Sequence, residues 1–239
     1  MLMKRISSGI EGLDELTGGG FIKGSNVMIF GKAGSGKTIM SLEYIYKGAV
    51  MGEAGLFVSF DQTEEQLIEQ CIKLGWDVKK YMRKGLMKIY ALKIEDVDRD
   101  FVIKVFEEAG KVKAERMALD NLTLLAMSPF FLAGDKKFSI LYQDKIRVSN
   151  TPKQLVYNLV TILKDIPTTT IYVSGLGDEP TVTSDGISEY LCDGVVKLDI
   201  RSIGKSFLRT LEVQKMRRSS IKGGIHGFKI TDEGIQVGP

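Results

Sequence analysis

Hydrophobic and polar positions along the chain predict buried strands separated by helices. Short apolar runs, typical of strands covered on both faces, occupy 26–30, 56–60, 86–90, 117–120 and 169–173. Apolar residues at helical spacing occupy 39–46, 63–74, about 99–113 and 152–164. Near the C-terminus, 209–213 and 227–237 alternate as antiparallel strands do. This order predicts an α/β fold in which a mainly parallel, twisted sheet is flanked by helices and extended by antiparallel C-terminal strands.

The stretch between the first predicted strand and helix fits the P-loop (Walker A) pattern G-x-x-x-x-G-K-[ST]. It consists of Gly31, Lys32, Ala33, Gly34, Ser35, Gly36, Lys37 and Thr38. Glycines let the main chain wrap around phosphate oxygens, and the helix N-terminus adds the positive end of its dipole. We expect Lys37 to reach the β- and γ-phosphates and the Thr38 hydroxyl to bind magnesium. The alternative, a glycine-rich turn with a chance lysine, is disfavoured by the flanking strand and helix.

Acidic and amide side chains follow two other predicted strands. The run 117–119 ends in Asp120, as in a Walker B arrangement, and the run 56–60 ends in Asp61 and Gln62. Ligands bind beyond the carboxyl ends of parallel strands. We therefore expect Asp120 to hold magnesium beside Thr38, and Asp61 and Gln62 to lie near the terminal phosphate and its attacking water. A cap on the following helix, made by Asp61 or Thr63, is the structural alternative.

Composition and charge narrow the class of protein. The chain has 239 residues, 44% of them hydrophobic, and no linker-like stretch, so we expect a single domain over 1–239. A net charge of +3 favours neither nucleic acid nor membrane as a partner. Cys71, Cys192 and the single His226 lack metal-ligand spacing. Because neither a signal-peptide pattern nor a membrane-length apolar run is present, we expect a reduced, soluble, cytoplasmic protein.

The segment before the P-loop is glycine-rich. On physical grounds we expect Leu13, Leu16 and Phe21 to pack there, and the triple glycine at 18–20 to allow a tight approach to the P-loop strand. This segment reads Ile6-Ser7-Ser8-Gly9-Ile10, then Gly12-Leu13-Asp14-Glu15-Leu16, then Gly18-Gly19-Gly20.

With the P-loop, this segment resembles the KaiC-like branch of the RecA/RadA superfamily, which includes archaeal RadA paralogues. The similarity extends over nearly the whole chain. The resemblance implies a RecA-like P-loop NTPase core, ATP as the nucleotide and Mg²⁺ as the metal. It also implies a homo-oligomeric ring, which we expect to be a hexamer, with nucleotide at the subunit interfaces.

The chain departs from that family after the second predicted strand. The family usually has a glutamate pair there, one member acting as general base toward water, whereas this chain has Asp61 and Gln62. Aspartate can accept a proton but reaches less far, and glutamine can position water without accepting a proton. We therefore expect an ATPase that hydrolyses slowly, with Asp61 as base and Gln62 as a water-positioning candidate. An ATP-binding switch without significant turnover stays open.

Other positions take a role only through the resemblance. Lys215 and Arg217 match a Lys-x-Arg element that reaches the nucleotide of the adjacent subunit, where positive charge stabilises the transition state. A solvated basic hairpin is the alternative. Ser174 is a candidate γ-phosphate sensor. Glu189 and Tyr190 stand where KaiC carries phosphoacceptors, so neither autokinase activity nor a clock role is expected.

Two segments bear on nucleic-acid binding. Residues 128–150 interleave aromatic and basic side chains, as single-strand binders do, although burial of those aromatics is the preferred interpretation. The predicted loop 174–186 carries Asp178, Glu179 and Asp185 and would repel a polyanion. The leading hypothesis is an oligomeric, regulatory, Mg-dependent ATPase. The main alternative is a RadA-paralogue accessory protein that binds single-stranded DNA in recombinational repair.

Overall fold

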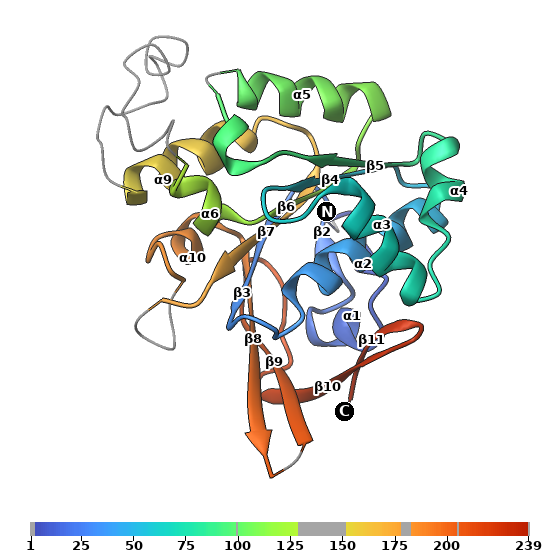
Figure 1. Cartoon of the computed structure of the whole chain (residues 1–239). Helices are drawn as coiled ribbons and strands as arrows, with labels where there is room; N and C mark the ends of the chain where they lie inside the picture. The colour runs from blue at the N-terminus through green and yellow to red at the C-terminus, as the bar shows by residue number, and fades with distance from the viewer. Residues whose placement is uncertain (1–2, 99, 129–151, 178–182, 205, 239) are drawn as a thin grey trace.

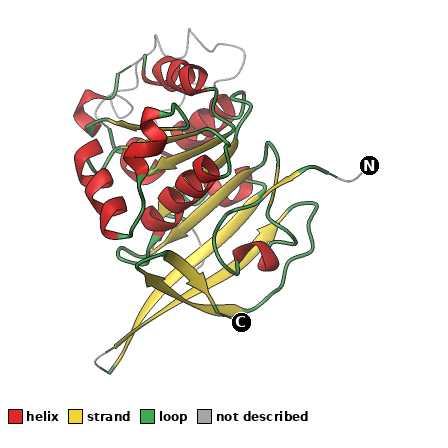
Figure 2. Ribbon diagram, turned by 90° about the vertical axis from the view of Figure 1, so that its right-hand side faces the viewer, coloured by secondary structure: helices red, strands yellow, loops and turns green. Residues whose placement is uncertain are grey.

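The computed structural model describes residues 3–98, 100–128, 152–177, 183–204 and 206–238. Within them, one large sheet has the strand order β11-β10-β9-β8-β3-β7-β6-β4-β5 (Figures 1 and 2). Its strands are β3 (Asn26–Gly31), β4 (Gly55–Ser59), β5 (Met87–Ala91), β6 (Arg116–Asp120), β7 (Thr169–Gly175), β8 (Gly194–Ile203), β9 (Ser206–Met216), β10 (Ile225–Thr231) and β11 (Gly234–Val237). Strands β8, β3, β7, β6, β4 and β5 pair in parallel, and β8 to β11 pair antiparallel. The predicted fold class is confirmed.

Helices cover both faces of the parallel strands (Figures 1 and 2). They are α1 (Leu13–Leu16), α2 (Lys37–Val50), α3 (Glu64–Lys73), α4 (Val78–Arg83), the 3₁₀ turn η1 (Ile94–Asp96), α5 (Phe101–Val112), α6 (Leu122–Ala126), α9 (Pro152–Leu163) and α10 (Ser188–Leu191). Along β3, Val27 and Ile29 join the core under α2, α3 and α4, whereas Met28 and Phe30 join the core under α5, α6 and α9. Burial on both faces explains why these strands read as continuous apolar runs.

The glycine-rich segment packs differently from the prediction. Leu13, Leu16 and Phe21 are buried, as expected. The triple glycine, however, does not approach the P-loop strand. Gly18 lies against the Ser220 carbonyl, and Gly19 and Gly20 lie against β1 (Arg5–Ile6), which pairs with β2 (Phe21–Ile22). Gly20 has φ +94°, and a Cβ there would lie 2.4 Å from the Ile6 carbonyl oxygen. A side chain at this position would therefore be both strained and in collision with the backbone.

The C-terminal strands also differ from the prediction in their bounds. Strand β9 continues to Met216, so Lys215 lies in a strand and not in a hairpin loop. The predicted strand 227–237 is two strands, β10 and β11, joined by a tight turn. Asp232 and Glu233 form that turn, and Gly234 follows it with φ +125°. Because Asp, Glu and Gly are poor strand residues, the sequence did contain a turn signal here.

Trp76, between α3 and α4, is a packing residue. It is buried, its ring stacks on Tyr46 with centroids 5.3 Å apart, and its Nε1 donates to the Glu233 carbonyl at 3.2 Å. The lone tryptophan therefore belongs to the core. Helix α4 begins next to it, at an Asp77 cap. As for membranes, the described helices include none long and apolar enough to cross a bilayer.

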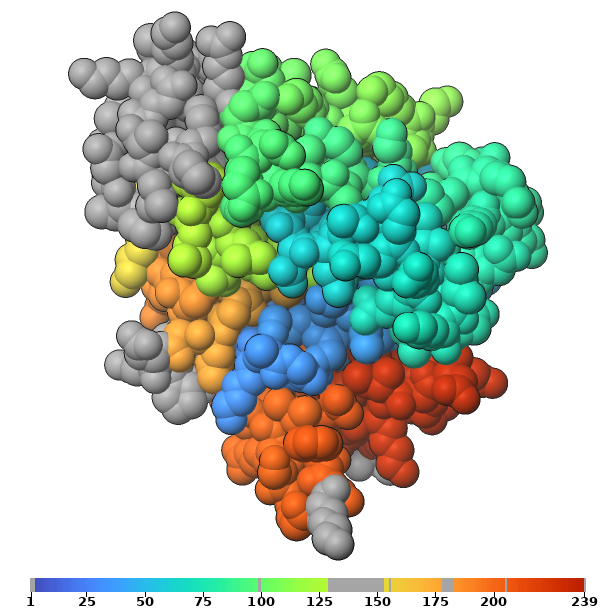
Figure 3. Space-filling model, in the orientation of Figure 1, coloured from blue at the N-terminus to red at the C-terminus, as the bar shows by residue number. Residues whose placement is uncertain are grey.

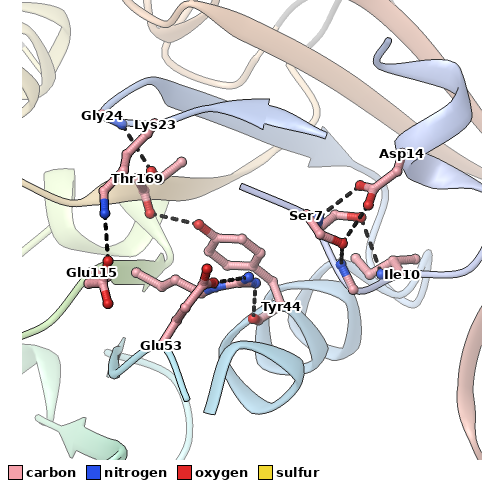
Figure 4. A network of polar contacts seen from close by, with 12 residues as sticks. Ser7, Ile10, Asp14, Lys23, Gly24, Tyr44, Glu53, Glu115 and Thr169 are labelled. Carbon is pink, nitrogen blue, oxygen red and sulfur yellow. Dashed lines mark hydrogen bonds and ion pairs between the residues drawn. The ribbon is translucent and has the colours of Figure 1, made fainter. Parts of the chain in front are cut away.

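A buried arginine fixes the P-loop helix α2 against the sheet, and Figure 4 labels two of its partners, Tyr44 and Glu53. Arg116, at the start of β6, is fully buried and stacks over the Tyr44 ring of α2 at 4.6 Å. Its Nη1 donates to the Tyr44 carbonyl at 3.0 Å, and its Nε and Nη2 donate to the Glu53 carboxylate. The Tyr44 hydroxyl donates to the Thr169 carbonyl of β7 at 2.9 Å. Helix α2 is thereby tied to the two strands, β6 and β7, that end at the site.

We expect Glu53→Gln to lower the free energy of unfolding by roughly 2–3 kcal/mol, because it leaves the buried guanidinium of Arg116 without a charged partner. This is less than for a fully buried pair, because the Glu53 side chain is 33% exposed. Glu115→Gln is the control, because Glu115 pairs with Lys23 at the surface and its loss should cost less than about 1 kcal/mol. Urea denaturation measures both, and equal losses would contradict this role for Arg116.

Candidate active site

The P-loop leaves the central strand β3 and leads directly into α2. Gly31 has φ +155°, and a Cβ there would lie 2.0 Å from the Leu198 carbonyl oxygen of β8. Gly36, the residue before α2, has φ +103° and lies against Ile230 of β10. Both positions therefore require glycine. In Figure 3 the blue surface of the loop and the start of α2 lies between the cyan surface that follows β4 and the orange and red surface of the C-terminal strands.

The structure places the Thr38 hydroxyl and the Asp120 carboxylate in direct contact. Thr38 Oγ1 donates to Asp120 Oδ2 at 2.6 Å, although the two residues are 82 positions apart. Asp120 is 4% exposed. Burial raises the pKa of Asp120 to about 6, against the lowering effects of Thr38 and Lys37. A hydroxyl and a carboxylate at one point are the oxygen ligands that Mg²⁺ takes beside phosphates, and a cation would offset the desolvation of Asp120, so this pair fits the metal.

Lys37 folds back over its own loop. Its Nζ donates to the carbonyl oxygens of Gly31 and Lys32, both at 2.8 Å. Burial lowers the pKa of Lys37, and the nearby Asp120 acts in the opposite direction. The Ser35 hydroxyl is buried in the same loop and has no hydrogen-bond partner among the described residues. The loop therefore holds a positive charge and a free hydroxyl where the sequence predicts phosphate.

Asp61 and Gln62 both line one hollow of the surface, but only Gln62 also lines the cavity beside the P-loop. Strand β4 lies beside β6, and Ser59 is the register partner of Asp120. Gln62 lines a cavity of about 210 Å³ together with Lys37 and Thr38, and its buried Oε1 has no partner in the described part of the chain. Asp61 does not line that cavity; it borders a second hollow of about 550 Å³. Of the two residues, Gln62 is the one that faces the P-loop.

The cap of α3 is Thr63. Its hydroxyl oxygen accepts a hydrogen bond from the Gln66 N–H, and Gln66 Oε1 accepts one from the Thr63 N–H. The Asp61 and Gln62 N–H groups donate instead to Ser59 Oγ, at 3.4 and 3.1 Å. The suggestion that Asp61 caps the helix was therefore wrong, whereas the suggestion for Thr63 was right.

Ser174 lies in strand β7 and not at the start of a loop, as the sequence analysis had placed it. It is the register partner of Phe30, immediately before the P-loop. Its buried hydroxyl lies 3.3 Å from each of three oxygens, on Thr123, Ser184 and Asp185. Ser184 is the exposed member of this cluster. Any contact of Ser174 with a phosphate would therefore require its neighbours to move.

Asp185 is an internal hydrogen-bond acceptor. It is 7% exposed and accepts from the N–H groups of Ile187 and Ser188, at 3.0 and 2.7 Å, and from the Ser188 hydroxyl at 2.9 Å. It thus holds the start of α10. Of the three acids expected to repel a polyanion from the loop 174–186, Asp185 cannot do so, because it is not exposed. Asp178 and Glu179 lie outside the described residues.

Lys215 and Arg217 bind carbonyls at the end of α10. Lys215 Nζ donates to the carbonyls of Glu189 and Cys192, at 3.0 and 2.7 Å. Arg217 donates to the Tyr190 carbonyl at 3.3 Å and lies 3.5 Å from Asp193. Neither residue lines the cavity beside its own P-loop. Their Lys-x-Arg pattern therefore remains a prediction about a neighbouring subunit.

Two further residues that the sequence analysis did not single out line the P-loop cavity. Gln70 comes from α3 and Arg209 from β9. Each has a buried polar atom, Gln70 Oε1 and Arg209 Nε, without a partner among the described residues. No local signal marks them, because one is an ordinary helix position and the other an ordinary strand position. Only the long-range packing of β9 and α3 around the loop brings them there.

A parallel sheet with a P-loop after its central strand, and with a carboxylate from β6 against the loop threonine, defines a P-loop nucleotide triphosphatase. The sequence profile of the family described as "ATPase: KaiC" matches residues 6–130 and 139–239. The chain therefore belongs to the KaiC ATPase family, whose members bind ATP through an ATPase domain.

Several known proteins are similar over the whole chain. UPF0273 protein MK0039 of Methanopyrus kandleri is 29% identical, with 100% of this chain and 94% of that protein aligned. The circadian clock oscillator protein KaiC of Synechococcus elongatus is 29% identical over 96% of this chain, which corresponds to 43% of KaiC. The crystal structure of KaiC-like protein PH0186 from Pyrococcus horikoshii superimposes with a TM-score of 0.81 at 28% identity, covering both chains fully.

The C-terminal strand β11 contacts the P-loop helix through a buried glutamate. Glu43 of α2 is 1% exposed, and its Oε2 accepts from the Ile235 N–H at 2.7 Å. Burial raises the pKa of Glu43 to about 7, although the Ile235 N–H acts in the opposite direction. The position of α2, and therefore of Lys37 and Thr38, depends on this contact with the end of the chain.

We expect Glu43 to make stability depend on pH. Its carboxyl holds a proton more tightly in the native state than in the unfolded chain, so the free energy of unfolding falls as pH rises from about 4.5 to about 7. Glu43→Gln should match the wild type near pH 4.5 and be more stable by roughly 1–3 kcal/mol near pH 8. Urea denaturation across this range tests it, with Glu69→Gln at an exposed position of α3 as the control. A wild-type-like slope in Glu43→Gln would contradict the assignment.

Proposed function

We propose that residues 1–239 form a single Mg-dependent ATPase domain, which binds ATP at Gly31–Thr38 and hydrolyses it slowly. The observation that supports this best is the 2.6 Å contact between Thr38 and Asp120, beside the Lys37 ammonium. We propose ATP as the nucleotide because the chain belongs to the KaiC ATPase family. We further propose that the protein is cytoplasmic and regulatory, and that ATP changes its contacts with other subunits or partners.

Each residue of the site has a distinct task in this proposal. The N–H groups of the loop and of the first turn of α2 orient the phosphates. Lys37 exchanges its two loop carbonyls for the β- and γ-phosphate oxygens, which places its charge where negative charge develops. Thr38 and Asp120 hold the metal, which when bound neutralises phosphate charge. Gln62 orients a water molecule from the cavity side, because its buried Oε1 is free to accept a hydrogen bond from that water.

Slow turnover follows from the acid available after β4. Asp61 stands at the position where the family has its glutamate base, yet it lines only the hollow of about 550 Å³. Gln62, and not Asp61, lines the cavity beside the P-loop. A base that is displaced by about 1 Å can lose ~10²-fold in rate. The geometry therefore also favours the second candidate function, an ATP-dependent switch in which binding, and not turnover, changes the protein.

We expect Asp61→Ala to lower the ATP turnover number by roughly tenfold or more if Asp61 is the base, while ATP affinity stays unchanged. Glu64→Gln is a matched control, because Glu64 borders the same hollow as Asp61. A coupled phosphate-release assay measures kcat, and calorimetry measures affinity. Equal rates for Asp61→Ala and the wild type would remove Asp61 from the mechanism.

We propose that Lys215 and Arg217 act in trans in a ring, expected to be hexameric. Their charged groups lie at the end of β9, held by carbonyls of 189–192 in their own chain, and do not line their own P-loop cavity. Arg217 is half exposed, so a neighbouring subunit has access to it. In trans, Lys215 and Arg217 would add positive charge at the terminal phosphate, as an arginine finger does.

Arg217→Ala is expected to lower ATPase activity by roughly 10³-fold or less, and only under conditions in which subunits assemble. The control is Arg201→Ala, because Arg201 is also exposed and paired with an aspartate but lies on the far part of the β8–β9 hairpin. Light scattering establishes assembly at each concentration used. An unchanged rate for Arg217→Ala in assembled protein would contradict action in trans.

The DNA-binding alternative has less support at this site. Residues 129–151, which contain the aromatic and basic side chains on which that hypothesis depends, lie outside the described residues. Lys215 and Arg217, the other basic residues invoked, donate to carbonyls of their own chain. Binding of single-stranded DNA by either segment therefore stays a prediction.

A further inference from the structure

Positive charge is concentrated at one margin of the molecule. Between Lys73 and Lys88 the sequence has six lysines or arginines and a single acid, Asp77, although the whole chain carries only +3. Five of these cations lie on α4, at its end, or at the end of α3. They are Lys73, Lys79, Lys80, Arg83 and Lys84, and we call them the α4 patch. Figure 1 shows α3 and α4 near the β5 edge of the sheet, away from the projecting β8–β9 hairpin.

The cations of the α4 patch are exposed and unpaired. All five side chains are exposed, and none forms an ion pair with any residue that the structure describes. Nearby, Lys88 differs, because it pairs with Glu108. Asp77 is occupied as the helix cap, where its Oδ1 accepts from the Lys80 N–H at 3.1 Å. The charge of the patch is therefore available to a partner.

The like charges are held at a spacing at which they repel. Lys79 and Arg83 are four residues apart, as are Lys80 and Lys84, and such like-charge pairs destabilise a helix by about 0.2–0.5 kcal/mol each. The helix persists because Val78 is buried and Tyr81 packs edge-on against Tyr46. The fold itself does not need four cations here, because the apolar side of α4 supplies the packing.

The patch has the chemistry of a polyanion site. The Nζ atoms of Lys80 and Lys84 lie 5.4 and 5.8 Å from the centroid of the Tyr81 ring, which itself packs against the domain. Ile72 is the one large apolar side chain exposed on α3 and α4, which is too little for insertion into a lipid surface. A row of lysines and arginines that outnumbers the neighbouring acids and lacks a large apolar anchor is what phosphate-backbone contacts use.

We propose that the α4 patch binds the phosphate backbone of nucleic acid, on a surface separate from the P-loop site. Recognition is electrostatic and independent of base sequence, because backbone contacts position a nucleic acid without reading it. The cations of the patch displace condensed counterions from the phosphates, so affinity falls steeply with salt. This surface does not depend on the ATPase proposal, since α4 contributes no residue to the P-loop cavity.

Fluorescence anisotropy with a labelled duplex and a labelled single strand, over a series of KCl concentrations, tests the proposal. The test variant is K79Q/K80Q/R83Q/K84Q, which removes four charges and keeps good helix formers. The matched control is K4Q/K113Q/K153Q/K229Q, which removes the same charge from exposed lysines elsewhere on the described chain. Urea denaturation and ATP binding verify that both variants are folded.

For the duplex, we expect the slope of log K against log salt to become shallower by about three to four in the α4 variant and to stay near the wild-type value in the control. For the single strand the change should be slightly smaller. Equal slopes in the two variants, or no wild-type binding at low salt, would overturn the proposal. Tighter binding of anionic vesicles or of polyglutamate than of either nucleic acid would also overturn it, in favour of a membrane or an acidic protein.

Discussion

The candidate site depends on one contact, the hydrogen bond from the Thr38 hydroxyl to the Asp120 carboxylate. The contact exists because β6 lies two strands from β3, so a carboxylate at the end of β6 reaches over β7 to the first turn of α2. A buried carboxylate whose pKa is raised to about 6 is unfavourable alone and favourable beside a cation. The same contact is thus the reason to propose a metal there, and it requires a rigid sheet.

Much of the rest of the structure keeps α2 in position relative to β6. Arg116 joins α2 to the start of β6, and Tyr44 joins it to β7. On the opposite side, Glu43 accepts from the Ile235 N–H of the last strand. Two of these buried polar groups, Glu43 and Tyr44, belong to α2 itself, and the third, Arg116, reaches it from β6. A shift of that helix would move Lys37 and Thr38 together.

The parts of the fold that could be predicted are those with a local cause. Buried parallel strands read as apolar runs, and the P-loop glycines are required by positive φ and by backbone contacts such as that between Gly31 and Leu198. Asp120 was found because it ends such a strand. Gln70 and Arg209 were not identified as site residues, because the P-loop that they face lies far away in sequence. Likewise, that Gln62 and not Asp61 lines the P-loop cavity depends on how β4 joins α3, which no periodicity encodes.

The central claim is that the P-loop, Thr38 and Asp120 together bind ATP with magnesium. Isothermal titration of the wild type with Mg·ATP, with ATP in EDTA, and of Lys37→Ala with Mg·ATP tests it most directly. The account predicts saturable heat with Mg·ATP, with affinity at least roughly tenfold weaker in EDTA or in the Lys37→Ala protein. Heat indistinguishable from dilution in the wild type, or identical isotherms for the wild type and Lys37→Ala, would contradict it.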